Sequence, residues 1–210
     1  MPKLIYFPVQ GRAQAIRYML ASKNVAFEDQ RITGAEWGPM KAAKTYGDAQ
    51  LPIYIRDDGT WLNQSVAILK TLAMEHGYAP ADAKALYENE WFYSTLVDTM
   101  EKPARYAIMK DDASAEEKQG VIGILDNIMN ALEAHFADGR EHVAGSAITD
   151  ADFYLMAIVT SSYENANGKH AEIREAGAAK VQACPNVMRV LAPMRELCAA
   201  QISSLEASSI

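Results

Sequence analysis

The stretch 53–77, which reads IYIRDDGTWLNQSVAILKTLAMEHG, decides the fold. Apolar and polar residues alternate on both sides of 57–59, Asp-Asp-Gly, a pattern typical of two strands joined by a tight turn. After Gln64 the apolar residues recur every three or four positions, which predicts a helix over 64–75 that ends at Gly77. A hairpin followed directly by such a helix predicts a small sheet with a helix packed on one face.

Two strand-and-helix pairs precede this hairpin. Residues 3–7 are apolar and end at Pro8, which predicts a strand, and the apolar spacing of 12–23 predicts a helix. Residues 27–32 and 35–44 repeat that order. Strand, helix, strand, helix, hairpin and helix in succession predict an α/β unit in which helices cover a mixed sheet.

Helical spacing dominates the rest of the chain. A proline-containing segment, residues 78–82, is the predicted linker. Beyond it we predict helices near 82–109, 115–136, 150–166, 171–182 and 187–203. Thr149 and Asp152 are spaced as a capping box for the third of these helices. The sequence therefore predicts an α/β domain over 1–79 and an all-α domain over 80–210.

Composition and charge exclude several classes of function. The 210 residues carry a formal net charge of −7, which argues against proteins that bind nucleic acid or anionic membranes through basic residues. The longest apolar run, residues 153–159, is far shorter than the roughly 20 residues that span a bilayer. Pro8 and Gln10 interrupt the N-terminal run, so we expect no secretory leader and a cytoplasmic protein.

Cysteine and histidine positions predict neither a disulfide nor a metal site. The two cysteines, Cys184 and Cys198, form no pair motif, and no zinc-ligand spacing relates the four histidines. Phosphate-loop, dinucleotide-binding and nucleophile-elbow motifs are absent from the sequence. Function must therefore be sought in a binding site of another kind.

Several short motifs, taken in order, resemble the cytosolic glutathione transferases, in particular the tyrosine-type group of sigma, mu, alpha and pi classes, and most closely sigma. They are LIYF at 4–7, GRAQAIR at 11–17, Trp37 with Lys41, Gln50-Leu51-Pro52, Gln64-Ser65 and TDADF at 149–153. The resemblance spans the whole chain. It implies a thioredoxin-like first domain with a mixed four-stranded sheet, and a helical second domain that contributes the electrophile pocket and dimer contacts.

The activity that the resemblance implies is conjugation of glutathione, as co-substrate, to hydrophobic electrophiles in detoxification. The resemblance makes Tyr6 the catalytic residue. A free thiol, with a pKa of about 8.5, is only slightly ionised at pH 7. A phenol that donates a hydrogen bond to the sulfur favours the thiolate, so Tyr6 acts as a donor and not as a base. Without the resemblance, Tyr6 is equally explained as a strand tyrosine packed in the core.

The resemblance also implies a set of glutathione-binding residues. Leu51 would pair with the peptide backbone to backbone, and the start of the helix after Gln64 suits the γ-glutamyl carboxylate. The full set is Tyr6, Arg12, Trp37, Lys41, Gln50, Leu51, Pro52, Gln64 and Ser65, together with Asp98 of the partner subunit in a homodimer. In that family the proline is cis, whereas most X-Pro bonds are trans. A plain helix cap at Ser65 and ordinary surface positions for the tryptophan, lysine and aspartate remain open.

The electrophile pocket carries no recognisable pattern. The resemblance places it around Pro8, Val9, Arg105, Tyr106 and Met109, and the electrophile stays unidentified. Gln10 and Gln14 stand where sigma-like members usually have Arg and Glu. Tyr46 is predicted to insert into the partner subunit of a homodimer as an aromatic key.

Three other functions stay open. One is a non-catalytic protein of the same fold that binds glutathione or another ligand, or has a structural role. Another is a glutathione-dependent prostaglandin isomerase, although such enzymes often carry Trp where this chain has Arg105-Tyr106. A thiol oxidoreductase is disfavoured because residues 1–80 contain no cysteine.

Overall fold

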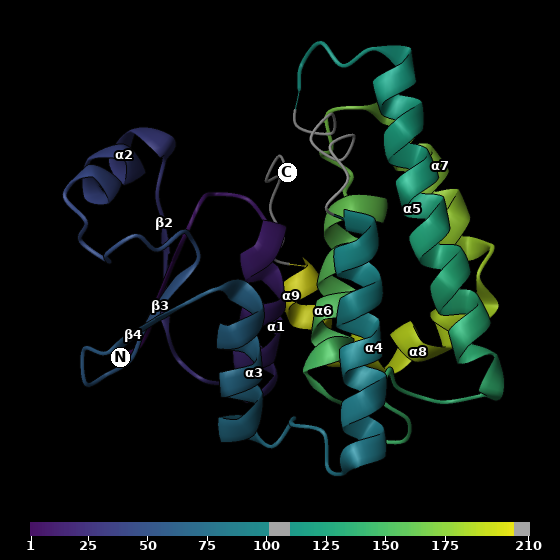
Figure 1. The fold of residues 1–210 in the computed structure, drawn as a ribbon, viewed down its shortest axis with the longest axis horizontal. Helices are drawn as coiled ribbons and strands as arrows, with labels where there is room; N and C mark the ends of the chain where they lie inside the picture. The colour runs from purple at the N-terminus through teal and green to yellow at the C-terminus, as the bar shows by residue number, and fades with distance from the viewer. Residues whose placement is uncertain (101–109, 204–210) are drawn as a thin grey trace.

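A mixed sheet of four strands forms the first half of the molecule (Figure 1). The computed structural model describes residues 1–100 and 110–203. The strands are β1 (Lys3–Tyr6), β2 (Glu28–Arg31), β3 (Ile53–Ile55) and β4 (Trp61–Asn63), in the order β2-β1-β3-β4. β1 pairs with β2 in parallel, and the other pairings are antiparallel. The predicted α/β unit and its hairpin are confirmed.

Helices cover both faces of the sheet. α1 (Gln14–Ser22) and α3 (Ser65–His76) lie between the sheet and the helical half, and α2 (Gly34–Ala42) lies on the other side (Figure 1). The alternation of side chains along a strand explains this division. Leu4 and Tyr6 belong to the main hydrophobic core, whereas Ile5 belongs to a smaller cluster on the opposite face.

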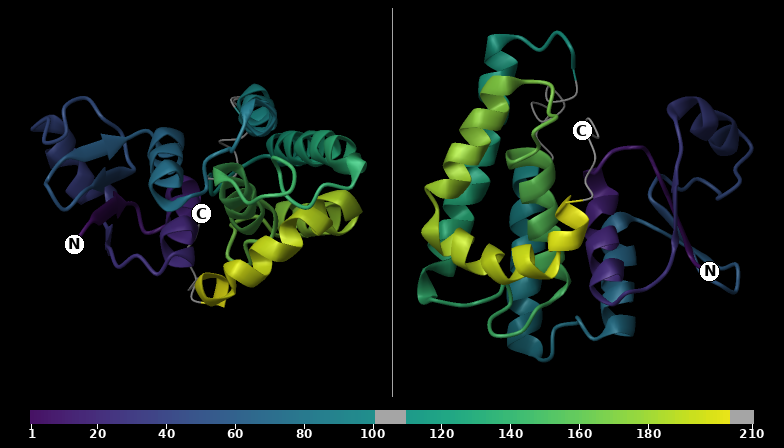
Figure 2. Two further views of the ribbon diagram at one scale, coloured as in Figure 1. Left: turned by 90° about the horizontal axis from the view of Figure 1, so that it is seen from below. Right: turned by 180° about the vertical axis from the view of Figure 1, so that it is seen from behind.

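The second half is helical, as predicted, and shares the main core with the sheet. Its helices are α4 (Ala83–Met100), α5 (Ala115–His135), α6 (Asp150–Ile158), α7 (Ala171–Gln182), α8 (Pro185–Leu197) and α9 (Ala199–Ser203). α1 packs against α6, and both views of Figure 2 place α1 beside the helical half. The buried Tyr18 of α1 donates a hydrogen bond to Thr160 Oγ1, 3.0 Å away. None of the helices in 1–100 or 110–203 is both long and apolar enough to cross a membrane.

Three of the predicted helices differ from the structure by more than the exact position of an end. The helix expected over 187–203 is divided at Cys198 into α8 and α9. The helix expected over 12–23 opens instead with a short 3₁₀ turn, η1 (Gly11–Ala13), because Gly11 has a φ of +41°. The helix expected over 150–166 ends at Ile158 and continues as a π turn, η4 (Val159–Tyr163). There the Thr160 hydroxyl donates to the Met156 carbonyl, and such side-chain bonds compete with the helical ladder.

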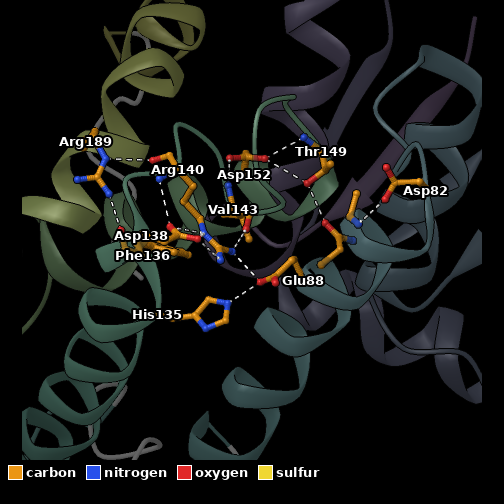
Figure 3. A network of polar contacts seen from close by, with 12 residues as sticks. Asp82, Glu88, His135, Phe136, Asp138, Arg140, Val143, Thr149, Asp152 and Arg189 are labelled. Atoms are coloured by element: carbon orange, nitrogen blue, oxygen red, sulfur yellow. Dashed lines mark hydrogen bonds and ion pairs between the residues drawn. The ribbon is translucent and has the colours of Figure 1, made fainter.

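The predicted capping box at the start of α6 is confirmed, and it is buried. Asp152 is 0% exposed, and its carboxylate accepts the Thr149 amide at 2.8 Å and the Val143 amide at 2.9 Å (Figure 3). This carboxylate therefore fixes both the helix start and the loop that precedes it.

Replacing Asp152 with alanine is expected to lower the free energy of unfolding by about 2–4 kcal/mol, because two buried amides lose their acceptor. Urea unfolding followed by circular dichroism measures it. The matched control is Glu36→Ala, which removes the same kind of box at the exposed start of α2. We expect a clearly smaller loss there, and equal losses would contradict the role given to burial.

Arg140 organises a second polar cluster in the helical half (Figure 3). Its guanidinium lies 2.7 Å from Glu88, 2.8 Å from Asp138 and 2.9 Å from the Val143 carbonyl. Hydrogen bonds from Arg140 lower the pKa of Asp138 to about 2. Burial by itself raises the pKa of Glu88, but hydrogen bonds from Arg140 and His135 outweigh it, so this pKa also lies below its usual value.

The cluster predicts a specific loss of stability in acid. Both carboxyl groups bind protons more weakly in the folded than in the unfolded chain, so their contribution is present above pH about 4 and disappears as pH falls toward 2. In Arg140→Gln the slope of unfolding free energy against pH in that window should be shallower than in the unmodified protein. Urea unfolding between pH 5 and pH 2.5 measures both slopes, and parallel curves would contradict the assignment.

Candidate active site

The strand register brings the predicted glutathione-binding segments to one edge of the sheet. Ile5 lies opposite Ile53, and Ile53 lies opposite Asn63. Continuing that register by one residue places Pro52 between Tyr6 on one side and Gln64 on the other. The parallel strand β2 ends at the same edge and leads into α2, which carries Trp37 and Lys41.

The Tyr6 hydroxyl accepts a hydrogen bond from the protein but donates none to a described residue. The residue is 8% exposed and ends β1. The amide of Arg12 donates a hydrogen bond to the hydroxyl oxygen, 3.2 Å away. No described residue accepts a hydrogen bond from this hydroxyl. One lone pair of the oxygen is thus engaged from the protein side while its O–H can donate to a ligand.

Gly11 makes this contact possible. Its φ of +41° lies in the left-handed region, where a side chain adds strain. A Cβ at this position would lie 2.8 Å from the Tyr6 hydroxyl and 3.1 Å from Cε1 of the ring. Glycine therefore lets the chain turn tightly over the phenol and bring the Arg12 amide to it.

Two cations near this edge are solvent-facing and unpaired. Arg12 and Lys41 are exposed, and neither side chain forms an ion pair with a residue in the described part of the chain. Both are available to an anionic ligand. Trp37 is partly buried and packs, like Leu51, against the cluster of Ile5 and Ile53. The structure therefore brings α2 close to the Leu51 segment.

The Leu51 segment offers free backbone groups. The Leu51-Pro52 peptide bond is cis. The amide and carbonyl of Leu51 form no hydrogen bond with any described residue. An extended peptide can form backbone hydrogen bonds with such groups, as it does when it pairs with the edge strand of a sheet. Gln50 beside it is exposed.

The start of α3 has the character of an anion site. Gln64, directly before the helix, has a φ of +67°, a strained value for a residue other than glycine. Ser65 is buried at the first helical position, and no side chain of 1–100 or 110–203 caps the start of α3. The helices α2, α5 and α6, in contrast, each have a capping box. The free amides and the positive end of the α3 dipole are thus left for a carboxylate.

Arg17 is a residue that the sequence analysis missed. Its side chain is 6% exposed, and its Cζ lies 5.9 Å from the centroid of the Tyr6 ring. Nε donates to both carboxylate oxygens of Asp29, at 3.2 and 3.1 Å. Burial lowers the pKa of the guanidinium, and Asp29 opposes that effect. A charged residue inside the apolar run of the predicted helix was the signal that could have revealed it.

Part of the predicted site cannot be placed. Asp98 lies on α4, but its side chain is outside the described residues, as are Arg105, Tyr106 and Met109. Pro8 is exposed and Val9 partly buried in the loop after β1. The electrophile pocket therefore stays a prediction.

The two cysteines of the chain are poorly suited to act as nucleophiles. Cys184 and Cys198 are buried and unpaired in the helical half. Burial raises the pKa of Cys198 to about 12 and also raises that of Cys184. Neither thiol therefore ionises near neutral pH. Within 1–100 and 110–203, no group of three or more His, Cys, Asp or Glu residues could hold a metal ion.

Comparisons with known proteins identify the family. No protein-family model matches the chain. Human hematopoietic prostaglandin D synthase is 33% identical over 162 residues, which cover 72% of this chain and 74% of that protein. A glutathione S-transferase of Anopheles gambiae is 31% identical over 163 residues, covering 75% of this chain and 77% of that protein.

The fold comparison agrees. The structure of a glutathione S-transferase from the hookworm Necator americanus, described as monomeric, has a TM-score of 0.79 at 20% identity. The match covers 99% of this chain and 98% of the hookworm chain. The fold is thus a thioredoxin-like unit joined to a helical one. With the two relatives above, these findings show that the chain belongs to the cytosolic glutathione S-transferase family of enzymes.

Proposed function

We propose that this enzyme binds glutathione along the sheet edge, holds its sulfur as a thiolate through Tyr6, and conjugates it to hydrophobic electrophiles. The observation that carries the proposal is the Tyr6 hydroxyl, which accepts the Arg12 amide and keeps its proton for a ligand. With a chlorodinitrobenzene acceptor, a carbon–sulfur bond forms, chloride leaves and the thiol proton passes to solvent. Thiolate formation and the proximity of two bound reactants supply the rate gain.

Each part of glutathione has a proposed partner. The γ-glutamyl carboxylate lies at the start of α3 against Gln64 and Ser65, where the amides are free. The cysteinyl residue pairs with the Leu51 backbone, which Pro52 and Gln50 flank. The other proposed partners are Trp37 and Lys41 for the glycyl end and Arg12 for the charge near the sulfur. The reaction uses glutathione as co-substrate and requires no metal.

The chain is proposed to work as two domains in a homodimer. Residues 1–79 bind glutathione, and residues 80–210 contribute the electrophile pocket and dimer contacts. Asp98 of the partner subunit completes the glutathione site. Exposed apolar side chains support an interface, since Trp61 is 41% and Tyr87 63% exposed.

Tyr46 is proposed as the aromatic key of that dimer. The centroid of its ring lies 5.7 Å from the centroid of the Trp61 ring.

Sedimentation equilibrium should return twice the chain mass, and Tyr46→Ala should shift the protein toward monomer and weaken glutathione binding. A fully active monomer would contradict the shared site.

The cytoplasm is the proposed compartment. The unpaired cysteines are consistent with this proposal, because thiols there are kept reduced.

An acceptor panel with glutathione tests the proposed function. We expect conjugation of small apolar electrophiles, with substitution of chlorodinitrobenzene as the reference reaction. Retention on glutathione resin without conjugation or peroxidase activity would instead indicate a carrier.

A specialised isomerase is the second candidate, because a prostaglandin D synthase is 33% identical to this chain. Isomerisation of a prostaglandin endoperoxide belongs in the same panel. Turnover of the endoperoxide well above conjugation would favour this candidate.

A further inference from the structure

One buried guanidinium joins three elements beneath the candidate site. Arg17 lies on α1, and its Nε donates to Asp29 of β2. Its Nη1 donates to the carbonyl of Val9 at 3.0 Å and to that of Gln10 at 3.2 Å. Because a guanidinium is a rigid planar fork, these bonds fix the loop between β1 and α1 relative to both neighbouring elements.

That loop positions the catalytic phenol. The two carbonyls bound by Arg17 come directly before Gly11 and Arg12, whose amide contacts the Tyr6 hydroxyl. A shift of this loop would therefore move the amide away from the phenol. The same cation lies near the Tyr6 ring, so it also acts on charge that develops at the bound sulfur.

The positive charge of Arg17 is only partly cancelled. The charged or titratable groups that act on it are Asp29 and Arg31 of β2 and Tyr6 of β1. Asp29 is shared, since Arg31 Nε lies 3.0 Å from one of its oxygens. Two guanidinium groups and one carboxylate leave a net charge of about +1.

The remaining contacts of the guanidinium add no negative charge. Nη2 of Arg17 is buried without a partner among the described residues. Gln14, also buried, accepts from Nη1 at 3.3 Å and is neutral. A charge left uncancelled away from water acts strongly on a nearby anion.

We propose that Arg17 is a positioning residue for the conjugation reaction. Arg17 holds the Val9 and Gln10 carbonyls, and with them the loop whose Arg12 amide contacts Tyr6. Its uncancelled charge favours the glutathione thiolate. The inference rests on the proposed function. This role predicts the direction in which the pKa of the bound thiol shifts when a charge near Arg17 is changed, whereas a purely structural role predicts no direction. Adding negative charge next to Arg17 disfavours the thiolate, and removing negative charge favours it.

Two nearly isosteric variants test the direction of this pKa shift. Gln14→Glu adds a negative charge at an atom that already accepts from Arg17, and it should raise the thiol pKa of bound glutathione by about half a unit or more. Asp29→Asn removes a negative charge and should lower that pKa. Ultraviolet titration of the thiolate in the complex measures both, with thermal melting recorded for each variant.

Removing the cation gives the larger effect. Arg17→Met should raise the pKa of the bound thiol by about one unit and lower kcat near pH 6.5 about tenfold, with a smaller change in KM for glutathione. Arg17→Lys keeps the charge but loses the planar fork. Compared with Arg17→Met, it should therefore reverse part of the rise in thiol pKa and restore only part of kcat. If the methionine variant does not fold, the Gln14 and Asp29 variants carry the test alone.

The outcomes separate this inference from the proposed function. Opposite shifts in Gln14→Glu and Asp29→Asn support the role of Arg17. Shifts of the same sign, or none, overturn it when Tyr6→Phe still raises the pKa of the bound thiol. If the unmodified protein binds glutathione without lowering its thiol pKa, the proposed function itself fails.

Discussion

Replacing Tyr6 with phenylalanine is expected to lower turnover of a chlorodinitrobenzene acceptor by about tenfold or more. Holding a thiol pKa about two units below its free value requires roughly 2.7 kcal/mol, which one charge-assisted hydrogen bond and nearby dipoles can supply. Phenylalanine keeps the ring and removes the donor, so the bound sulfur returns toward its protonated form. Affinity for glutathione should change little, because the contacts proposed for the carboxylates and backbone of the peptide do not involve the Tyr6 hydroxyl.

Tyr54→Phe is the matched control for that variant. Tyr54 is a buried tyrosine of the same sheet, and its hydroxyl forms no hydrogen bond with a described residue. Initial rates at saturating glutathione should therefore match those of the unmodified protein. The role given to Tyr6 is wrong if Tyr6→Phe also keeps full turnover.

The second large effect is expected from Gly11→Ala. The new methyl group would meet the Tyr6 hydroxyl at 2.8 Å, so either the ring or the turn must move. We expect the contact between the Arg12 amide and the phenol to break and turnover to fall about tenfold or more. The positive φ should also lower the free energy of unfolding by about 1 kcal/mol or more.

Gly59→Ala separates the two consequences. Gly59 also has a positive φ, +84°, but a Cβ there meets nothing within 4 Å. It should lose a comparable amount of stability, measured by urea unfolding, and keep its activity. Equal losses of activity in both alanine variants would show that backbone strain, and not the crowding of Tyr6, explains the effect at Gly11.

The sequence predicted the elements that depend on local pattern. Alternation around 57–59 identified the hairpin, and helical spacing after Gln64 identified α3, because both signals lie within a few residues. The capping box at Thr149 was found for the same reason. Such features need no knowledge of distant contacts.

Features that depend on distant pairs were missed. Arg17 of α1 is buried against Asp29 of β2, and although a charge inside an apolar run indicates an unusual residue, the sequence does not indicate which partner it pairs with. The π turn after α6 involves Thr160, which meets Tyr18 of α1 far along the chain. The candidate site lies between these cases, because its residues are recognisable as motifs but only the strand register brings them to one edge.

The most direct measurement is an ultraviolet titration of glutathione bound to the unmodified enzyme. We expect a thiol pKa at least about one unit below the value of about 8.5 for a free thiol, and a return toward that value in Tyr6→Phe. A bound thiol that titrates as it does in buffer would show that the Tyr6 hydroxyl does not stabilise a thiolate.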